Sequence, residues 1–170
     1  AAQYHQGRSS ADHSIVSGSW DRCIRQWDVT TGKLITKMMH HDISNSSSSA
    51  SGAHYVPNYE GRRNNIHISD LQSAYHNPWI VTAMNNGLCK IWDSVSNQVT
   101  YQFHHSKSHE HSTNMETCAI FTPSDRNIIT ATQDGSCKIW DMRKLSEKNC
   151  LKSFSVHSGV NRISISSYHS

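Results

Sequence analysis

The sequence predicts an all-β fold made of repeated units of short strands, and three observations support this prediction. A fourteen-residue pattern occurs three times without a gap, at residues 15–28, 80–93 and 128–141. Every copy opens with two aliphatic residues, has Ser or Thr third and ends in Trp-Asp. The chain of 170 residues is only 17% charged and holds 5 Trp and 6 Tyr, which argues against wholesale disorder. Such self-similarity is typical of a repeat architecture.

Each copy is predicted to form a β-hairpin. The segment before the turn is rich in β-branched residues, and the segment after it alternates in character. Asn-Gly and Asp-Gly are strong turn signals because both residues tolerate positive φ, and Asp-Arg is a weaker one. The three turns are Asp21-Arg22, Asn86-Gly87 and Asp134-Gly135. One column of the second strand is cationic, and we expect it to be solvated or at a sheet edge: Arg25, Lys90 and Lys138.

Further short strands complete each unit. A strand is predicted after each Trp-Asp, over residues 33–36, 98–101 and 150–154. Another is predicted over residues 117–121 ahead of the third copy, where Pro123 closes it, and strand character resumes at residues 66–68 ahead of the second. Residues 1–4 and 159–165 have the character of inner strands at the two ends of the chain.

Four short strands per unit, ending in Trp-Asp, resemble the WD-repeat β-propeller family. The resemblance implies an all-β partial β-propeller of about three four-stranded WD-repeat blades. A closed propeller needs about 4–8 blades. We therefore expect a fragment, an open arc of a larger, seven-bladed propeller.

The spacing of the copies divides the chain into segments. Trp27 and Trp92 are 65 residues apart and Trp92 and Trp140 are 48 apart, against about 40–45 residues per blade. The predicted segments are a blade over 1–41 with its inner strand truncated, a Ser/Gly/Arg-rich insertion over 42–65, a second blade over 66–103, a His-rich loop over 104–114, a third blade over 115–156 and the start of a fourth over 157–170.

The resemblance also implies a buried hydrogen-bonded tetrad in each blade, formed by a His, a Ser or Thr, the turn Asp and the Trp. Carried over by position, its members are Ser17, Asp21 and Trp27, then Thr82, Asn86 and Trp92, then Thr130, Asp134 and Trp140. His109 or His111 would supply the imidazole of the third blade. Because Asn86 is neutral, we expect the second blade to be the loosest.

A hydrolase or metal site is the alternative chemistry, and the sequence disfavours both. Ser or Thr with Asp and His is also the composition of a catalytic triad, but here it recurs in every blade and no G-x-S-x-G elbow accompanies it. His105, His109 and His111 are weak candidates for zinc, since no C-x-x-C or H-E-x-x-H frames them. We expect no enzyme activity, no metal and no cofactor.

Interaction candidates lie at the hairpin tips. Trp20 precedes the first turn Asp, Asn85 and Gln133 occupy its column in the other copies, and Arg22 adds a charge. Exposed Trp is a frequent hot-spot residue, and packing of Trp20 against a neighbouring loop is the alternative. In addition, Trp140-Asp141-Met142-Arg143 resembles the W-D-x-R motif by which some WD-repeat proteins dock a cullin ubiquitin-ligase adaptor, and the resemblance makes Arg143 the key contact.

Composition narrows the setting and the partners. Five cysteines without a C-x-x-C pair favour a reduced, intracellular protein, cytoplasmic or nuclear. A net charge of +3 without a basic stripe disfavours nucleic-acid binding, for which Arg62-Arg63 and the column cations are the candidate phosphate contacts. No apolar run is long enough for a transmembrane helix. The stretch Val160-Asn161-Arg162-Ile163 resembles WD-repeat proteins that bind phosphofurin acidic cluster sorting adaptors, which implies a non-catalytic interaction scaffold.

Overall fold

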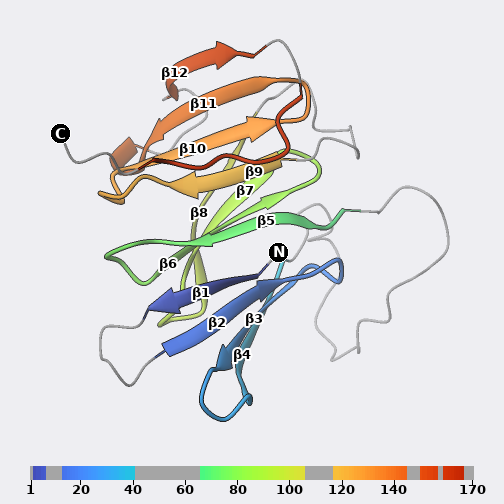
Figure 1. Ribbon diagram of the computed structural model, residues 1–170, viewed down its shortest axis with the longest axis vertical. Coiled ribbons are helices and arrows are strands. Elements are labelled where there is room, and N and C mark those ends of the chain that lie inside the picture. Colours follow the sequence, from blue (N-terminus) through green and yellow to red (C-terminus); the bar gives the residue numbers. More distant parts are fainter. Residues whose placement is uncertain are drawn as a thin grey trace, which may run out of the picture.

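Three four-stranded antiparallel sheets make up the computed structural model, which describes residues 2–6, 13–40, 66–105, 117–144, 150–156 and 159–166 (Figure 1). The first sheet has the order β1 (Ala2–Gln6), β2 (His13–Gly18), β3 (Cys23–Asp28), β4 (Leu34–Met39). The second contains β5 (Ile68–Ser73), β6 (Trp79–Met84), β7 (Leu88–Asp93) and β8 (Gln98–His104). The third contains β9 (Thr117–Phe121), β10 (Asn127–Thr132), β11 (Ser136–Asp141) and β12 (Cys150–Ser155), with a turn of 3-10 helix at Met142–Lys144. The predicted all-β arc of about three four-stranded blades is confirmed.

The central hairpins turn where the sequence pattern places the turns. Arg22, Gly87 and Gly135 occupy the same column and have φ values of 64°, 80° and 86°. Glycine adopts this left-handed conformation freely, whereas Arg22 is held in it against its preference. The residue before each of them accepts a hydrogen bond from the N–H two positions on, at 2.9–3.1 Å: Asp21 from Cys23, Asn86 from Leu88 and Asp134 from Ser136.

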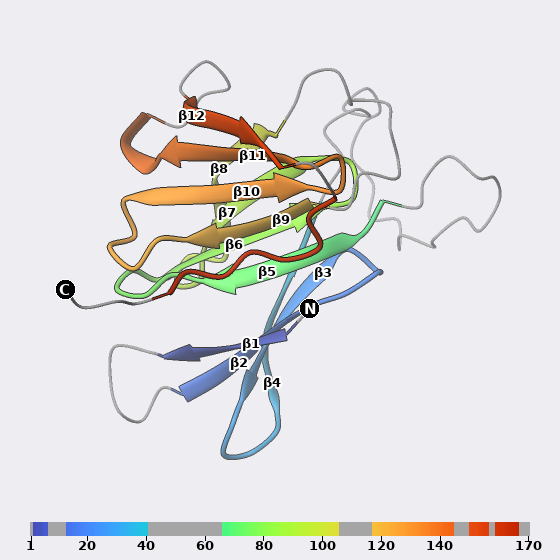
Figure 2. The ribbon, with the colours of Figure 1, turned by 45° about the horizontal axis from the view of Figure 1, so that its top comes forward.

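The second sheet is buried on both faces, because it lies between the first sheet and the third (Figure 2). In the second sheet Ile80 and Thr82 face one side together with their cross-strand partners Trp92 and Lys90. Their neighbours along the strands face the other side. The first face packs on the first sheet, in a core of Val16, Ile24, Met38, Ile68, Leu71, Ile80 and Trp92. The second face packs on the third sheet, in a core that includes Val81, Ile91, Phe103, Phe121, Ile128 and Trp140.

Polar side chains of β5 complete the inner edge of the third sheet. Asp70 Oδ2 accepts from the N–H of Ala119 at 3.3 Å, Gln72 Oε1 accepts from the N–H of Phe121, and Ser69 Oγ donates to the carbonyl of Thr117 at 2.7 Å. Backbone groups along the free edge of β9 are thereby hydrogen-bonded to side chains of β5 instead of to the backbone of a neighbouring strand. This pairing brings the innermost strands of the two sheets side by side.

A second link joins the same two sheets at one end of their strands. Asp125, in the β9–β10 turn, is 3% exposed, and its carboxylate lies in a ring of donors from the β5–β6 loop. The N–H groups of Tyr75, His76 and Asn77 donate to it at 2.8, 2.6 and 3.1 Å, and the Asn77 amide donates at 3.1 Å. We call these contacts the Asp125 clasp.

Residues 159–166 run across the inner strands as an extended segment without strand pairing (Figure 2). Val160 and Ile163 pack on Cys118, Ala131 and Cys137 of the third sheet. The position agrees with an inner strand of a following blade, which stays a prediction. Within the described ranges, no helix is long and apolar enough to cross a membrane.

Candidate functional site

A buried polar network in the third sheet centres on the Thr130 hydroxyl. Trp140 Nε1 donates to Thr130 Oγ1 at 2.8 Å, and His105 Nδ1 lies 2.8 Å from the same oxygen. The other ring nitrogen of His105 lies 3.1 Å from Ser136 Oγ. All three central residues are at most 1% exposed. The hydroxyl therefore joins an indole and an imidazole in a site without access to bulk water.

The imidazole of this network comes from the preceding sheet. His105 directly follows β8, and its backbone N–H donates to the carbonyl of Gly87 at 2.9 Å. The sequence pattern pointed instead to His109 or His111, and both lie outside the described residues. The physical reason is that the residue directly after an outer strand already lies beside the next sheet. His105 therefore reaches the network without an intervening loop.

The second sheet repeats this network with an imidazole from the first. Trp92 Nε1 donates to Thr82 Oγ1 at 3.1 Å, and His40 Nε2 lies 2.9 Å from that oxygen. His40 directly follows β4, and its N–H donates to the carbonyl of Arg22 at 3.1 Å. The sequence analysis named no His for this blade, although His40 and His105 occupy the same place after an outer strand.

The first sheet has the same hydroxyl–indole pair in a more open setting. Trp27 Nε1 donates to Ser17 Oγ at 2.9 Å, and both side chains are half-buried. Beside them Arg25 forms an ion pair with Asp21, and this hydrogen bond lowers the pKa of Asp21 to about 2. The second blade was expected to be the loosest because of Asn86. The structure shows greater exposure in the first, because Ser17 and Trp27 lie on the face of that sheet turned away from the second. Asn86 makes the same turn contact as Asp21 and Asp134.

Trp20 lies at the tip of the β2–β3 turn and is 69% exposed. Its ring stacks on His67, with centroids 4.2 Å apart and planes 4° from parallel. His67 is buried and paired with Asn85: the His67 N–H donates to Asn85 Oδ1 at 2.9 Å, and the Asn85 N–H donates to the carbonyl of His67 at 3.1 Å. Trp20 therefore rests on a fixed support with its other face open.

The remaining interaction candidates differ in accessibility. Asn85 was predicted to contact a partner, but it is 3% exposed and serves instead to hold His67. Gln133 is exposed at the equivalent tip of the third sheet, and Arg22 is half-buried. At the opposite end, the Arg143 side chain is 79% exposed. Its Nε and Nη2 donate to Asp141 at 3.1 and 2.7 Å, which lowers the pKa of Asp141 to about 2.

Comparison with protein-family models matches three segments of the chain, residues 8–28, 55–93 and 101–141, to the WD40 family, described as WD domain, G-beta repeat. The matches cover more than half of the residues. The chain belongs to the WD40-repeat family.

A curated WD40-repeat relative is also similar in sequence. The target of rapamycin complex subunit LST8 of Saccharomyces cerevisiae is 25% identical over 114 residues, which cover 54% of this chain and 37% of the relative. The chain thus spans little more than a third of that relative's length.

The WD40 networks are built for packing rather than for nucleophilic chemistry. The Thr130 hydroxyl already binds an indole N–H and an imidazole, and its burial leaves no room for a substrate. Burial also raises the pKa of the Cys118 thiol to about 11 and that of Cys89 further, so the thiol forms dominate at neutral pH. Among the described residues, no group of three or more His, Cys, Asp or Glu is placed to hold a metal ion. The zinc candidates His109 and His111 lie outside that part of the chain.

Two of the three column cations of this WD40 chain, Lys90 and Lys138, are internal, contrary to the sequence-based expectation, and Arg25 is partly exposed. Lys90 is 4% exposed, Lys138 donates from Nζ to the carbonyl of His105 and lies 5.8 Å over the Trp140 ring, and Arg25 pairs with Asp21. Lys90 and Lys138 are cross-strand partners of Thr82 and Thr130 and face the neighbouring sheet, whereas Arg25 pairs with Ser17 on the face of the first sheet that is turned away from the second. Lys90 and Lys138 are therefore withdrawn from any phosphate backbone. Arg62 and Arg63 lie outside the described residues.

Two polar features were missed by sequence reasoning. The Asp125 clasp joins residues about fifty positions apart, and its sequence signal is only an Asp in a turn after Pro123. A cavity of about 610 Å³ lies between β5, β9 and residues 159–166, and Asp70, Cys118 and Arg162 are among its lining residues. Burial raises the pKa of the Asp70 carboxyl there.

Proposed function

We propose that the chain is a non-catalytic protein-interaction scaffold that presents its loop tips to protein partners. Membership of the WD40-repeat family supports this, and the similar yeast protein is named as a complex subunit. The stacked sheets, their two shared cores and the buried networks supply a rigid frame. In this proposal the frame has no reacting group and acts by holding its tips in fixed positions.

The observation that carries the proposal is the Trp20 tip. The indole is 69% exposed, yet stacked on the ring of the buried His67, whose backbone N–H and carbonyl are hydrogen-bonded to Asn85. A large aromatic side chain that is already ordered loses little conformational entropy on binding, and such residues are frequent hot spots. Trp20 is therefore the proposed centre of a partner contact.

The finer assignment rests on resemblance. In the order of its features the chain is most similar to WD-repeat-containing protein 37, through Ser19-Trp20-Asp21-Arg22, Ala119-Ile120-Phe121-Thr122 and Val160-Asn161-Arg162-Ile163. The resemblance makes phosphofurin acidic cluster sorting adaptors the proposed partners, and an intracellular location, cytoplasmic or nuclear, the proposed setting.

Titration of a purified sorting adaptor against the chain tests the proposal. We expect Trp20→Ala to weaken the affinity at least about 30-fold, since hot-spot truncations cost roughly 2 kcal/mol or more. Tyr101→Ala is the matched control, because Tyr101 is an exposed aromatic residue on the outer strand β8. Equal affinities for wild type and Trp20→Ala would refute the binding role, and so would a loss of the folded signal in that variant.

A second candidate function is that of a substrate receptor of a cullin-type ubiquitin ligase, acting through Trp140-Asp141-Met142-Arg143. The exposure of Arg143 favours it, as does the contact with Asp141 that fixes the direction of the guanidinium. Co-purification of the ligase adaptor with wild type but not with Arg143→Ala would support this function. Retention of the adaptor by Arg143→Ala would exclude it.

A further inference from the structure

The end of the third sheet opposite Gln133 carries a compact group of cationic and aromatic side chains. Tyr75 and His76 belong to the β5–β6 loop, Arg126 to the β9–β10 turn, and Arg143 and Lys144 to the 3-10 turn after β11. We call these five residues the basic end. All are exposed, with Tyr75 at 52% and the Arg143 side chain at 79%.

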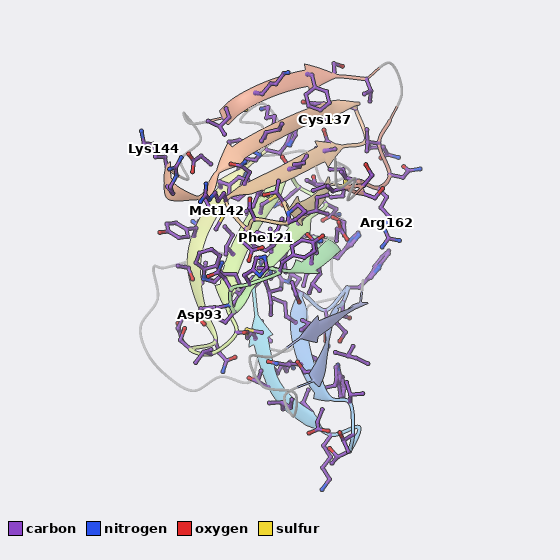
Figure 3. All side chains as sticks on the ribbon, turned by 60° about the vertical axis from the view of Figure 1, so that its left-hand side comes forward. Asp93, Phe121, Cys137, Met142, Lys144 and Arg162 are labelled. Carbon is purple, nitrogen blue, oxygen red and sulfur yellow. The ribbon has the colours of Figure 1, made fainter. Side chains whose placement is uncertain are left out.

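Two contacts hold the three segments of the basic end together. The Asp125 clasp fixes the loop of Tyr75 and His76 to the turn that contains Arg126. The Met142 N–H donates to the carbonyl of Arg126 at 2.9 Å, which fixes the 3-10 turn to the same place. Figure 3 shows Met142 and Lys144 together at this end of the sheet, away from Cys137. The basic end is therefore one surface and not three separate loops.

The cationic side chains of this surface point outward, whereas the neighbouring carboxylates of Asp125 and Asp141 are turned inward and already accept hydrogen bonds. Asp125 is 3% exposed and accepts four hydrogen bonds from residues 75–77. Asp141 is 7% exposed and accepts from the backbone and the guanidinium of Arg143. At the same end of the second sheet, the half-buried Asp93 accepts from the N–H of Val95 at 2.8 Å. Within the described ranges, the charged side chains that remain outward at the end of the third sheet are Arg126, Arg143 and Lys144.

We propose that the basic end is a docking surface for an acidic protein segment rich in Asp or Glu. Carboxylates complement the three cations, and Arg143 keeps guanidinium N–H groups beyond those that it donates to Asp141. Tyr and Arg are the residue types that protein interfaces favour. A nucleic-acid partner would typically neutralise about 6–10 phosphates, more than three cations supply. The inference goes beyond the proposed partner contact at Trp20, because the basic end lies at the opposite end of the strands. It shares Arg143 with the second candidate function, so its test substitutes Arg126 and Lys144 instead.

Fluorescence anisotropy with a labelled peptide of alternating Glu and Ser tests the inference, with the Gln-and-Ser peptide as the neutral probe. We expect the acidic peptide alone to bind, and the double variant Arg126→Gln/Lys144→Gln to weaken it roughly three- to tenfold. The matched control is Lys33→Gln/Lys37→Gln, which removes the same charge from exposed positions of the first sheet and should change the affinity little. Unchanged thermal midpoints establish that all variants fold.

Three outcomes would overturn the inference. These are an unchanged affinity in Arg126→Gln/Lys144→Gln, an equal loss in Lys33→Gln/Lys37→Gln, and tighter binding of a single-stranded RNA or of anionic vesicles with the same dependence on Arg126 and Lys144. Trp20→Ala should leave binding of the acidic peptide unchanged. The inference and the proposed function can therefore fail separately.

Discussion

At the scale of single residues, one Ser or Thr hydroxyl in each sheet is the hydrogen-bond partner of the Trp that ends the repeat. The sequence places Ser17, Thr82 and Thr130 ten positions before a Trp, and this spacing is enough to predict that indole and hydroxyl lie together, because both are fixed by one hairpin. The same spacing could not identify the imidazoles of His40 and His105 as the third members of the networks. They approach from 42 and 25 residues away, and only the stacking of the sheets brings them near.

Replacing Thr130 by Val tests the value of this hydroxyl. Valine has nearly the same shape, so the change leaves the Trp140 indole and the His105 imidazole without their shared partner in a buried site. We expect the free energy of unfolding to fall by about 1–3 kcal/mol. Ser17→Ala should cost less, below about 1 kcal/mol, because Ser17 is half-buried and water can replace it. Urea unfolding measures both, and equal losses would contradict the argument.

Asp70 gives a prediction on pH. Burial raises the pKa of its carboxyl above the value of about 3.9 in the unfolded chain. The folded state then binds the proton more tightly, so stability falls as the pH rises from about 4 through the folded-state pKa. Asp70→Asn has no carboxyl to titrate, and its amide oxygen can still accept from the Ala119 N–H. We expect this variant to be more stable than wild type near neutral pH, with a gap that closes toward pH ~3 in urea titrations. A gap independent of pH would contradict the assignment.

At the scale of elements, the turn residues determine where each hairpin turns, and contacts between residues far apart in the sequence link the end of one sheet to the next. Asn86-Gly87 and Asp134-Gly135 predicted their turns from the sequence. Asp21-Arg22 forms the same turn although Arg22 must adopt a φ of 64°, because the strands around it fix the geometry. The Asp125 clasp could not be predicted in this way, since its donors belong to a loop of another sheet.

Asp125→Asn tests whether the clasp ties the second sheet to the third. Asn also tolerates the left-handed backbone seen here at a φ of 54°, so the change acts on the side chain alone. It removes the charge and turns an amide NH₂ toward donors, which should cost about 1–3 kcal/mol. Hydrogen exchange should lose protection at the amides of Tyr75, His76 and Asn77. Asp93→Asn, within a single turn of the second sheet, is the control; if both variants exchange alike at these amides, the clasp has no special role.

At the scale of the whole molecule, the sheets form a stack in which each contacts its neighbours through one core. The repeats and their Trp-Asp ends predicted this architecture. They could not predict that Lys90 and Lys138 lie inside it, because a cation in an alternating strand suggests a solvated face when only one sheet is considered. In the stack the neighbouring sheet covers the face that carries these two lysines, and Lys138 then donates to the carbonyl of His105.

Phe103→Ala tests whether the second and third sheets are stable together. Phe103 is 2% exposed, and its ring lies 4.9 Å from that of Trp140 across the core. Truncation should cost about 3–5 kcal/mol through lost burial and the cavity left behind. In a stack of nearest neighbours, exchange protection should then fall in β10 and β11 as well as in β6–β8, and β2–β4 should change least. Tyr101→Ala, two residues away on the same face of β8 but 43% exposed, should cost less than Phe103→Ala. If Phe103→Ala disturbed the second sheet alone, the shared core would not couple the sheets.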